Sequence, residues 1–252
     1  MLSVRVMPCL LLRNSKLVKT VRFKDPDYIG DPVNAVKIYN DKEVDELIFL
    51  DITATIDQKS PNFKTIGEIA SECFMPMTYG GGIRTIDEMR RIYNLGVEKI
   101  AINSYAVENP DIISKASTIF GSQSVLVAMD VKRRLMGGYE VFTHGARKGT
   151  KLDPVDWARK AEALGAGEIL LTSIDRDGTY EGYDTELIRK VSDSVSVPII
   201  ACGGAGKVED FAKAVEAGAS ACAAGSMVVY QGKGRGVLIN FPSQKEMRAI
   251  LP

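Results

Sequence analysis

The chain has 252 residues, 32 lysines and arginines against 32 aspartates and glutamates, 45% hydrophobic and 25% charged residues. These values are typical of an ordinary globular domain, and about 250 residues is the usual length of one (β/α)8 barrel. Zero net charge argues against nucleic acid as a bulk partner, which requires a basic face. We therefore predict a single domain over residues 1–252 with no nucleic-acid partner.

Short β-branched runs alternate with amphipathic helical stretches along the chain, and several helices end just before a glycine, as at Gly96, Gly165 and Gly218. This alternation predicts a parallel sheet and, at this length, a closed TIM barrel of the α/β class. An open doubly wound sheet is the alternative, disfavoured because no GxGxxG follows the first strand. The predicted strands are 4–10, 47–52, 77–79, 99–103, 124–130, 168–173, 197–202 and 219–224, and the predicted helices include 61–73, 86–95, 154–164, 185–191 and 208–217.

The four cysteines form no CxxC pair, and three of them lie in apolar runs, which favours free thiols in a reducing compartment. No apolar run reaches about 18 residues, and the first residues lack the layout of a signal peptide. We expect a cytoplasmic protein with no membrane partner.

Three short motifs recur in the same order in the two halves of the chain. The run that begins at Glu46 resembles the run at Glu168, 122 residues later, and Ala101-Ile-Asn-Ser resembles Ala223-Ala-Gly-Ser. Between them, Gly80-Gly-Gly-Ile resembles Gly203-Gly-Ala-Gly. Ordered repeats at nearly one offset indicate two homologous half-barrels.

Each half carries a group of small residues at its predicted strand ends, where this fold has its working face. Glycines let the backbone approach an anion, and small polar side chains complete the hydrogen bonds. Tight βα turns are the alternative for either group alone, but two equivalent groups predict a bis-phosphorylated small molecule as ligand. The first cradle comprises Gly82, Asn103 and Ser104, and the second comprises Gly178, Gly204, Gly225 and Ser226.

Carboxylates at strand ends are candidate acids or bases, because partial burial raises a carboxyl pKa toward neutrality. Asp130 follows the fifth strand, Asp51 the second, and Asp175 and Asp177 the sixth. For each of these aspartates, the alternative to an acid–base role is a structural one, in which the carboxylate caps a loop or pairs with an arginine. The only histidine, His144, has no second histidine or cysteine group beside it, so we expect no metal site.

Several longer motifs in the chain resemble those of a known protein family. Residues 5–229 resemble the cyclase subunit of imidazole glycerol phosphate synthase, the HisF family, through Phe49-Leu-Asp-Ile-Thr-Ala, Val107-Glu-Asn-Pro, Phe120-Gly-Ser-Gln and the long run from Gly165 to Thr179. The resemblance implies a heterodimer with a glutaminase subunit, which passes ammonia through the barrel. It also implies lyase chemistry on a bis-phosphorylated ribonucleotide, without a cofactor.

That family uses two aspartates, at the ends of strands one and five. Asp130 matches the second, but Leu11 stands at the first and cannot exchange a proton, so cyclase activity is expected to be impaired. Lys19 matches the lysine of the family's substrate loop, although Thr20 replaces the usual glycine after it. A proline-stiffened segment follows, which we expect to close less freely over a substrate.

Four charged residues at strand starts match the family's ammonia gate on the barrel floor: Arg5, Glu46, Lys99 and Glu168. Salt bridges that only stabilise the floor are the alternative. In the segment 230–242, Lys233 and Arg235 are candidates for holding an anion or a partner, and a solvated linker to the last helix is the alternative.

Two segments, Cys9-Leu-Leu-Leu near the start and the later Gly-Lys-x-Arg-x-Val-Leu-Ile, are similar to a HisF-like branch associated with surface-polysaccharide genes. That likeness implies a subunit that hands ammonia to an ATP-dependent sugar amidotransferase, which builds acetamidino groups on nucleotide sugars. This is the leading hypothesis. A genuine cyclase of histidine biosynthesis is the second, and a small-molecule isomerase related to the same half-barrel ancestor is the third.

Overall fold

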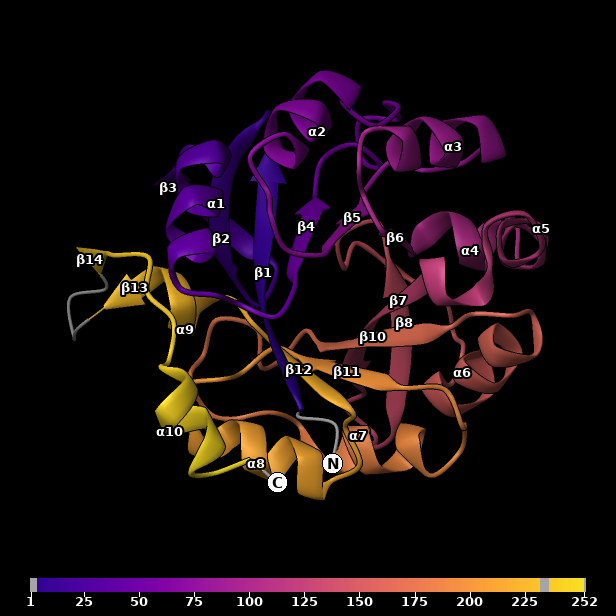
Figure 1. The fold of residues 1–252 in the computed structure, drawn as a ribbon. Coiled ribbons are helices and arrows are strands. Elements are labelled where there is room, and N and C mark those ends of the chain that lie inside the picture. Colours follow the sequence, from indigo (N-terminus) through magenta and orange to yellow (C-terminus); the bar gives the residue numbers. More distant parts are fainter. Residues whose placement is uncertain (1–3, 232–235, 252) are drawn as a thin grey trace.

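A computed structural model describes residues 4–231 and 236–251 and shows a closed parallel barrel (Figure 1). Strand β7 pairs with β10 and so closes the circle, which confirms the predicted TIM barrel over the open-sheet alternative. In the order of their pairing, the eight barrel strands are β10 (Glu168–Ser173), β11 (Ile199–Cys202), β12 (Ala221–Ala224), β1 (Arg5–Arg13), β4 (Leu47–Asp51), β5 (Met77–Gly80), β6 (Lys99–Ile102) and β7 (Val125–Arg133).

Helices surround the barrel, and their ends carry the signals that the sequence contains. Thr85 and Glu88 form a capping box at the start of α3, and Gly96, Gly165 and Gly218 follow α3, α6 and α8 with positive φ. The larger helices are α1 (Pro32–Asp41), α2 (Phe63–Ala70), α3 (Ile86–Asn94), α5 (Asp111–Phe120), α6 (Pro154–Ala163), α7 (Thr185–Ser192) and α8 (Glu209–Glu216). Shorter elements are α4 (Ser104–Glu108), η1 (Ser122–Ser124), α9 (Ser226–Val229) and α10 (Gln244–Arg248).

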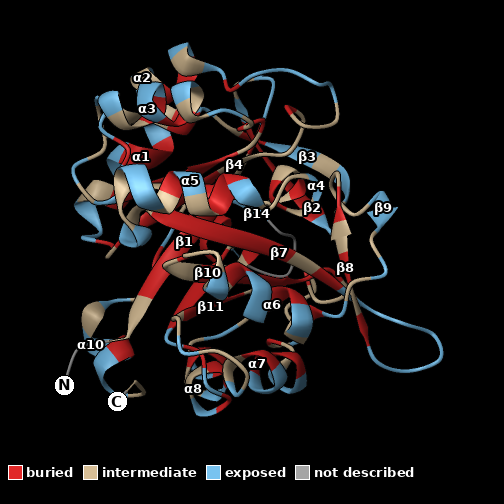
Figure 2. Cartoon of the chain, turned by 90° about the vertical axis from the view of Figure 1, so that its right-hand side faces the viewer, coloured by how far each residue is buried: buried red, intermediate tan, exposed pale blue. Residues whose placement is uncertain are grey.

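Alternation along the strands divides the buried residues into two layers, since successive side chains point to opposite faces. On β1, Val6, Leu10 and Leu12 belong to the large cluster beneath the helices, whereas Met7 and Cys9 belong to a smaller cluster inside the barrel. Figure 2 shows the barrel strands mostly buried and the outer helix faces exposed.

The strand register supports the half-barrel repeat. Leu50, four residues after Glu46, pairs with Leu11, and Thr172, four residues after Glu168, pairs with Asp130. Leu11 and Asp130 therefore occupy equivalent positions in the first half (β1, β4, β5, β6) and the second half (β7, β10, β11, β12).

Both half-barrels extend their first strand into an antiparallel hairpin, which the sequence analysis missed. β2 (Lys16–Val21) pairs with β1 and with β3 (Lys24–Gly30), while β8 (Tyr139–Thr143) pairs with β7 and with β9 (Lys148–Gly149). The predicted ends of strands one and five, at residues 10 and 130, were therefore too early by three residues each.

The end of the chain packs back on the barrel. β13 (Tyr230–Gln231) pairs with β14 (Gly236–Val237), the backbone N–H of Leu238 donates to the carbonyl of Val229, and Phe241 is buried. Gly236, Val237, Leu238 and Asn240 are nevertheless exposed, so this segment remains largely solvated, as the linker interpretation expects, and is anchored at Phe241. Lys233 and Arg235 lie outside the described residues. Within the described ranges, no helix is both long and apolar enough to cross a membrane.

Candidate active site

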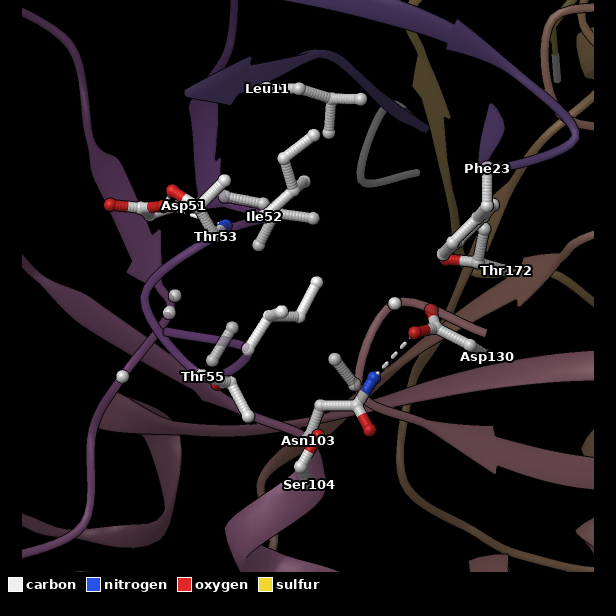
Figure 3. A pocket seen from close by; sticks show the side chains of 18 of the residues that line it. Leu11, Phe23, Asp51, Ile52, Thr53, Thr55, Asn103, Ser104, Asp130 and Thr172 are labelled. Atoms are coloured by element: carbon white, nitrogen blue, oxygen red, sulfur yellow. Dashed lines mark hydrogen bonds between the residues drawn. The ribbon is translucent and has the colours of Figure 1, made fainter. Parts of the chain in front are cut away.

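A cavity of about 430 Å³ opens at the carboxyl ends of the barrel strands, where this fold places its active sites. It reaches down to Cys9, Ala101, Ala128 and Leu170 inside the barrel. Its upper wall carries both kinds of predicted residue, the glycine cradle and the strand-end acid. Figure 3 shows Leu11 and Asp130 on opposite sides of this cavity.

Asp130 is the strand-end carboxylate with the properties of an acid–base group. Its Oδ2 accepts a hydrogen bond of 2.7 Å from the amide of Asn103. Burial raises the pKa of Asp130 to about 7, against the lowering effect of the Asn103 hydrogen bond, and the nearby charge of Asp177 adds to the rise. A carboxyl with that pKa exchanges protons readily near neutrality.

The other strand-end carboxylates hold loops, as the capping alternative predicted. Oδ1 of Asp51 accepts hydrogen bonds from the backbone of Thr53 and Ala54 and from the Thr53 hydroxyl. Asp175 accepts from the backbone N–H of Arg133 at 2.8 Å. Neither lies at the position of Leu11 on β1, so the cavity has an apolar side chain where the second acid would stand.

The first cradle faces the cavity. Gly81 and Gly82 have φ of +124° and +72°, and a Cβ on Gly82 would lie 2.7 Å from the carbonyl of Lys59, so the turn needs glycine there. Asn103 and Ser104 line the same wall. The glycine turn and these two polar side chains therefore border the cavity together.

His144 is a contact of the first cradle that the sequence analysis did not find. Its backbone N–H donates to Oγ of Ser104 at 3.0 Å, and its ring Nε2 lies 3.5 Å from Glu108. The residue has φ of +56°, in a left-handed turn with Gly145 and Ala146. No pattern in the sequence signals a non-glycine residue in that conformation.

The second cradle does not line this cavity. Gly204 packs against Gly182, whose N–H donates to the Gly204 carbonyl at 2.9 Å. The hydroxyl of Tyr180 donates to the carbonyl of Ser226, and Gly178 lies beneath the β2–β3 hairpin. The two cradles are equivalent in sequence, but only the first lines the strand-end cavity.

Lys19 lies on β2 and is 5% exposed. Its ammonium group is 3.9 Å from Oδ1 of Asp177 and packs against Gly225. The predicted substrate-loop lysine is thus part of an ordered hairpin, and its side chain enters the second cradle.

The four predicted floor residues form a closed cycle of ion pairs. Nζ of Lys99 lies 3.0 Å from both Glu46 and Glu168, and the Arg5 guanidinium contacts the same two carboxylates. Glu46 also accepts a 2.8 Å hydrogen bond from the Thr78 hydroxyl and is 3% exposed. The cycle lies at the starts of the barrel strands, at the end of the barrel opposite the cavity.

All four cysteines are free, and Cys9 and Cys202 lie together inside the barrel. Their mutual hydrogen bond, together with burial, raises the pKa of the Cys9 thiol; the same hydrogen bond lowers that of Cys202. In the described part of the chain, no group of three or more histidines, cysteines, aspartates or glutamates is placed to hold a metal ion.

The fold, the half-barrel register and the strand-end cavity define a two-half (β/α)8 barrel. Residues 5–235 match the family model described as "Histidine biosynthesis protein". The chain is 47% identical over 248 residues to a Pseudomonas aeruginosa protein named "Putative imidazole glycerol phosphate synthase subunit hisF2", covering 98% of this chain and 99% of that one. It is 48% identical over 231 residues to the imidazole glycerol phosphate synthase subunit HisF of Alkaliphilus metalliredigens, covering 91% of this chain and 92% of that one. The chain belongs to the HisF family of histidine biosynthesis proteins.

Proposed function

We propose that this chain is an ammonia-conducting subunit, which receives ammonia from a glutaminase partner at the barrel floor and releases it at the strand-end cavity. The observation that carries the proposal is the combination of Leu11 at the strand-end cavity with a complete cycle of ion pairs on the floor. The floor keeps all four charged residues, while the cavity lacks one member of the acid–base pair. A barrel with a complete floor cycle but no acid at position 11 is suited to delivering ammonia rather than to cyclising a ribonucleotide.

The lining of the barrel interior suits a small neutral molecule better than an ion. Above the floor cycle, the inner layer combines larger side chains with the alanines Ala101, Ala128, Ala221 and Ala223. An uncharged ammonia molecule enters such a lining at far lower cost than ammonium, because an ion leaving water without a partner is strongly disfavoured. We propose that Arg5, Glu46, Lys99 and Glu168 act as the gate, opening when the partner binds.

The acceptor in this proposal is an ATP-dependent amidotransferase that builds acetamidino groups on a nucleotide sugar for surface polysaccharide. This step rests on the resemblance of the chain's start and tail to the HisF-like branch. It requires that ammonia leave the cavity unreacted, and Leu11 opposite Asp130 is consistent with that requirement.

The test is an assay of the purified chain with ammonium salt and the bis-phosphorylated ribonucleotide, beside an authentic HisF subunit. We expect turnover at least about 10²-fold lower than that of the authentic subunit, since loss of one proton-transfer group costs roughly 10²–10⁴ in rate. Turnover within a few-fold of the authentic enzyme overturns the proposal. A glutaminase encoded beside this chain should co-purify with it and become more active in its presence.

A genuine cyclase subunit is the second candidate, and a specific observation favours it. Asp130 keeps a pKa of about 7 and its contact with Asn103, so one acid–base group is ready for the reaction. In that case Asp130 carries most of the proton transfer, and the same assay gives substantial turnover with ammonium salt.

A further inference from the structure

The hairpin of β7 and β8 carries an apolar turn at its tip. The two strands continue past Asp130, and the turn between them projects from the barrel as an exposed loop (Figure 2). Leu135 and Met136 lie in this turn with exposed fractions of 107% and 101%, the two highest of any large hydrophobic side chain in the described ranges. Two adjacent apolar side chains on a projecting tip are a candidate interaction surface.

The turn itself does not require apolar residues. The N–H of Gly137 donates to the carbonyl of Arg134 at 3.1 Å, so Leu135 and Met136 are the two central residues of a β-turn. Proline, aspartate, asparagine, serine and glycine are the usual residues of such turns. Gly137 and Gly138 take the positive φ values, +90° and +80°, that close the hairpin. The local geometry therefore gives no reason for leucine and methionine.

The base of the hairpin is firmly held. Tyr139 is 4% exposed, and its hydroxyl donates to Asp184 at 3.0 Å and accepts from the guanidinium of Arg133 at 2.7 Å. The same guanidinium donates to Glu186 at 2.7 Å. A tip held in one conformation loses little freedom when a partner binds, which favours its use as an anchor.

The equivalent hairpin of the first half has a different tip. β1 and β2 are joined by Asn14 and Ser15, which are both polar. The Ser15 hydroxyl accepts hydrogen bonds from the Asn62 amide at 2.9 Å and from the Thr65 hydroxyl at 2.7 Å, so this tip is tied to the start of α2. An apolar, unattached tip is therefore a property of the second hairpin and not of the repeated unit.

Positive charge surrounds the apolar tip. In a chain with no net charge, residues 131–151 contain six basic side chains and one acidic side chain: Lys132, Arg133, Arg134, Arg147, Lys148 and Lys151 against Glu140. All six basic residues are exposed. An apolar anchor with a basic rim complements a protein surface that has an apolar pocket with an acidic rim.

The hairpin also places its partner over the cavity. Met136 is six residues beyond Asp130 on the same hairpin, which corresponds to about 20 Å of extended chain. Gly145 and Arg147, in the turn after β8, line the cavity. A protein held at the tip would therefore lie over the cavity opening and receive ammonia before bulk water dilutes and protonates it. A membrane at the same place would provide no acceptor.

We propose that Leu135 and Met136 anchor the ammonia acceptor, the ATP-dependent amidotransferase, on the cavity face of the barrel. The two apolar side chains enter a pocket of the partner, and the exposed lysines and arginines around them pair with its acidic rim. This inference rests on the proposed function, because the occupant is the acceptor of the delivered ammonia.

The experiment measures the affinity of the purified amidotransferase encoded beside this chain for the complex of the chain with its glutaminase, by biolayer interferometry. The double variant Leu135→Ser/Met136→Ser should bind at least about tenfold more weakly, mainly through faster dissociation. Tyr28→Ser is the matched control, since Tyr28 is 62% exposed on β3 of the other hairpin, and should leave the affinity unchanged. Equal affinities of wild type and double variant, or an equal loss in Tyr28→Ser, overturn the proposal.

A second variant tests the charged rim. Lys148→Glu/Lys151→Glu should slow association about tenfold at low salt, and the difference should shrink at high salt, because exposed charges steer the encounter and are screened by ions. An unchanged association rate at low salt contradicts an acidic rim and overturns the proposal. Because all four substituted side chains are exposed, an unchanged melting temperature is expected and shows that each variant is folded.

Failure of this inference can be told apart from failure of ammonia delivery. If wild type and the tip variant bind the amidotransferase equally, the tip is not the anchor and ammonia delivery stands. If neither binds it, this inference fails, and the cyclisation assay decides ammonia delivery separately. Two further outcomes overturn the inference by giving the tip another occupant: sedimentation with phosphatidylserine-containing vesicles, or dimerisation of the chain, that the tip variant loses.

Discussion

Asn103 donates a 2.7 Å hydrogen bond from its side-chain amide to Oδ2 of Asp130, across the boundary between the two half-barrels. One residue belongs to the predicted phosphate cradle and the other is the candidate acid. The orientation of the cradle amide and the charge of the acid are therefore linked. A ligand at Asn103 should change the proton affinity of Asp130.

Asp130→Asn should stabilise the protein at alkaline pH. The pKa of this carboxyl is about 7 in the fold, raised by burial from an ordinary value of 3.8. The folded state thus binds a proton that the unfolded state has lost between these values, so the Asp130 contribution to stability falls as pH rises through that window. At pH 8 the variant should gain roughly 2–4 kcal/mol in the free energy of unfolding.

Urea titrations at pH 4, 6 and 8 measure this effect. The difference between variant and wild type should be small at pH 4 and grow toward pH 8. An equal difference at all three values contradicts a raised pKa of Asp130.

Leu11→Asp should restore cyclisation if the top face is otherwise competent. The register places this residue as the equivalent of Asp130, so the new carboxylate supplies the missing half of the acid–base pair. We expect a gain of about 10²-fold or more in turnover with ammonium salt. Leu11→Asn is the control, since its amide is similar in size but does not exchange a proton; a similar gain in both variants would point to polarity rather than acid–base chemistry.

Glu46→Ala should destabilise the barrel strongly. Glu46 is 3% exposed and contacts Arg5, Lys99 and Thr78, so its removal takes from two cations one of the two carboxylates that they share. Such losses cost about 3–5 kcal/mol. Asp87→Ala breaks the exposed Asp87–Arg90 pair and should cost less than about 1 kcal/mol. Chemical denaturation compares the two, and equal costs would mean that the floor cycle contributes no more than a surface pair.

Asp177→Ala should release the first hairpin. It removes the acceptor of Thr20 and Phe23 and leaves Lys19 without its carboxylate. Amide hydrogen exchange over residues 16–30 should accelerate at least about tenfold, because fewer contacts then oppose local opening. Asp175→Ala, which removes a bond to the Arg133 backbone, is the control and should leave that segment unchanged. Equal exchange in both variants would show that other contacts hold the hairpin.

Periodicity and repeats were sufficient to predict the barrel, because short apolar runs alternate with amphipathic helical stretches along the chain. The four floor residues and the missing acid at Leu11 were instead inferred from the resemblance to the HisF family. Both inferences depend on matching positions in the sequence and not on which side chains meet.

The hairpins and the closure of the second cradle were not predictable in this way. β3 contains Pro26 and several charged residues, so nothing in its composition indicates a strand; pairing with β2 decides it. Similarly, Gly204 and Gly225 match the first-half positions in sequence. Their access depends on Lys19 and Gly182, which come from elsewhere in the chain. Long-range contacts, rather than local pattern, make the two halves differ.

The equivalence of Leu11 and Asp130 has a consequence for how such a barrel diverges. The first half offers the accessible glycine turn and the second half offers the acid, so neither half duplicated alone would reproduce the cavity. A barrel made of two first halves would lack the acid, and one made of two second halves would lack the accessible glycine turn.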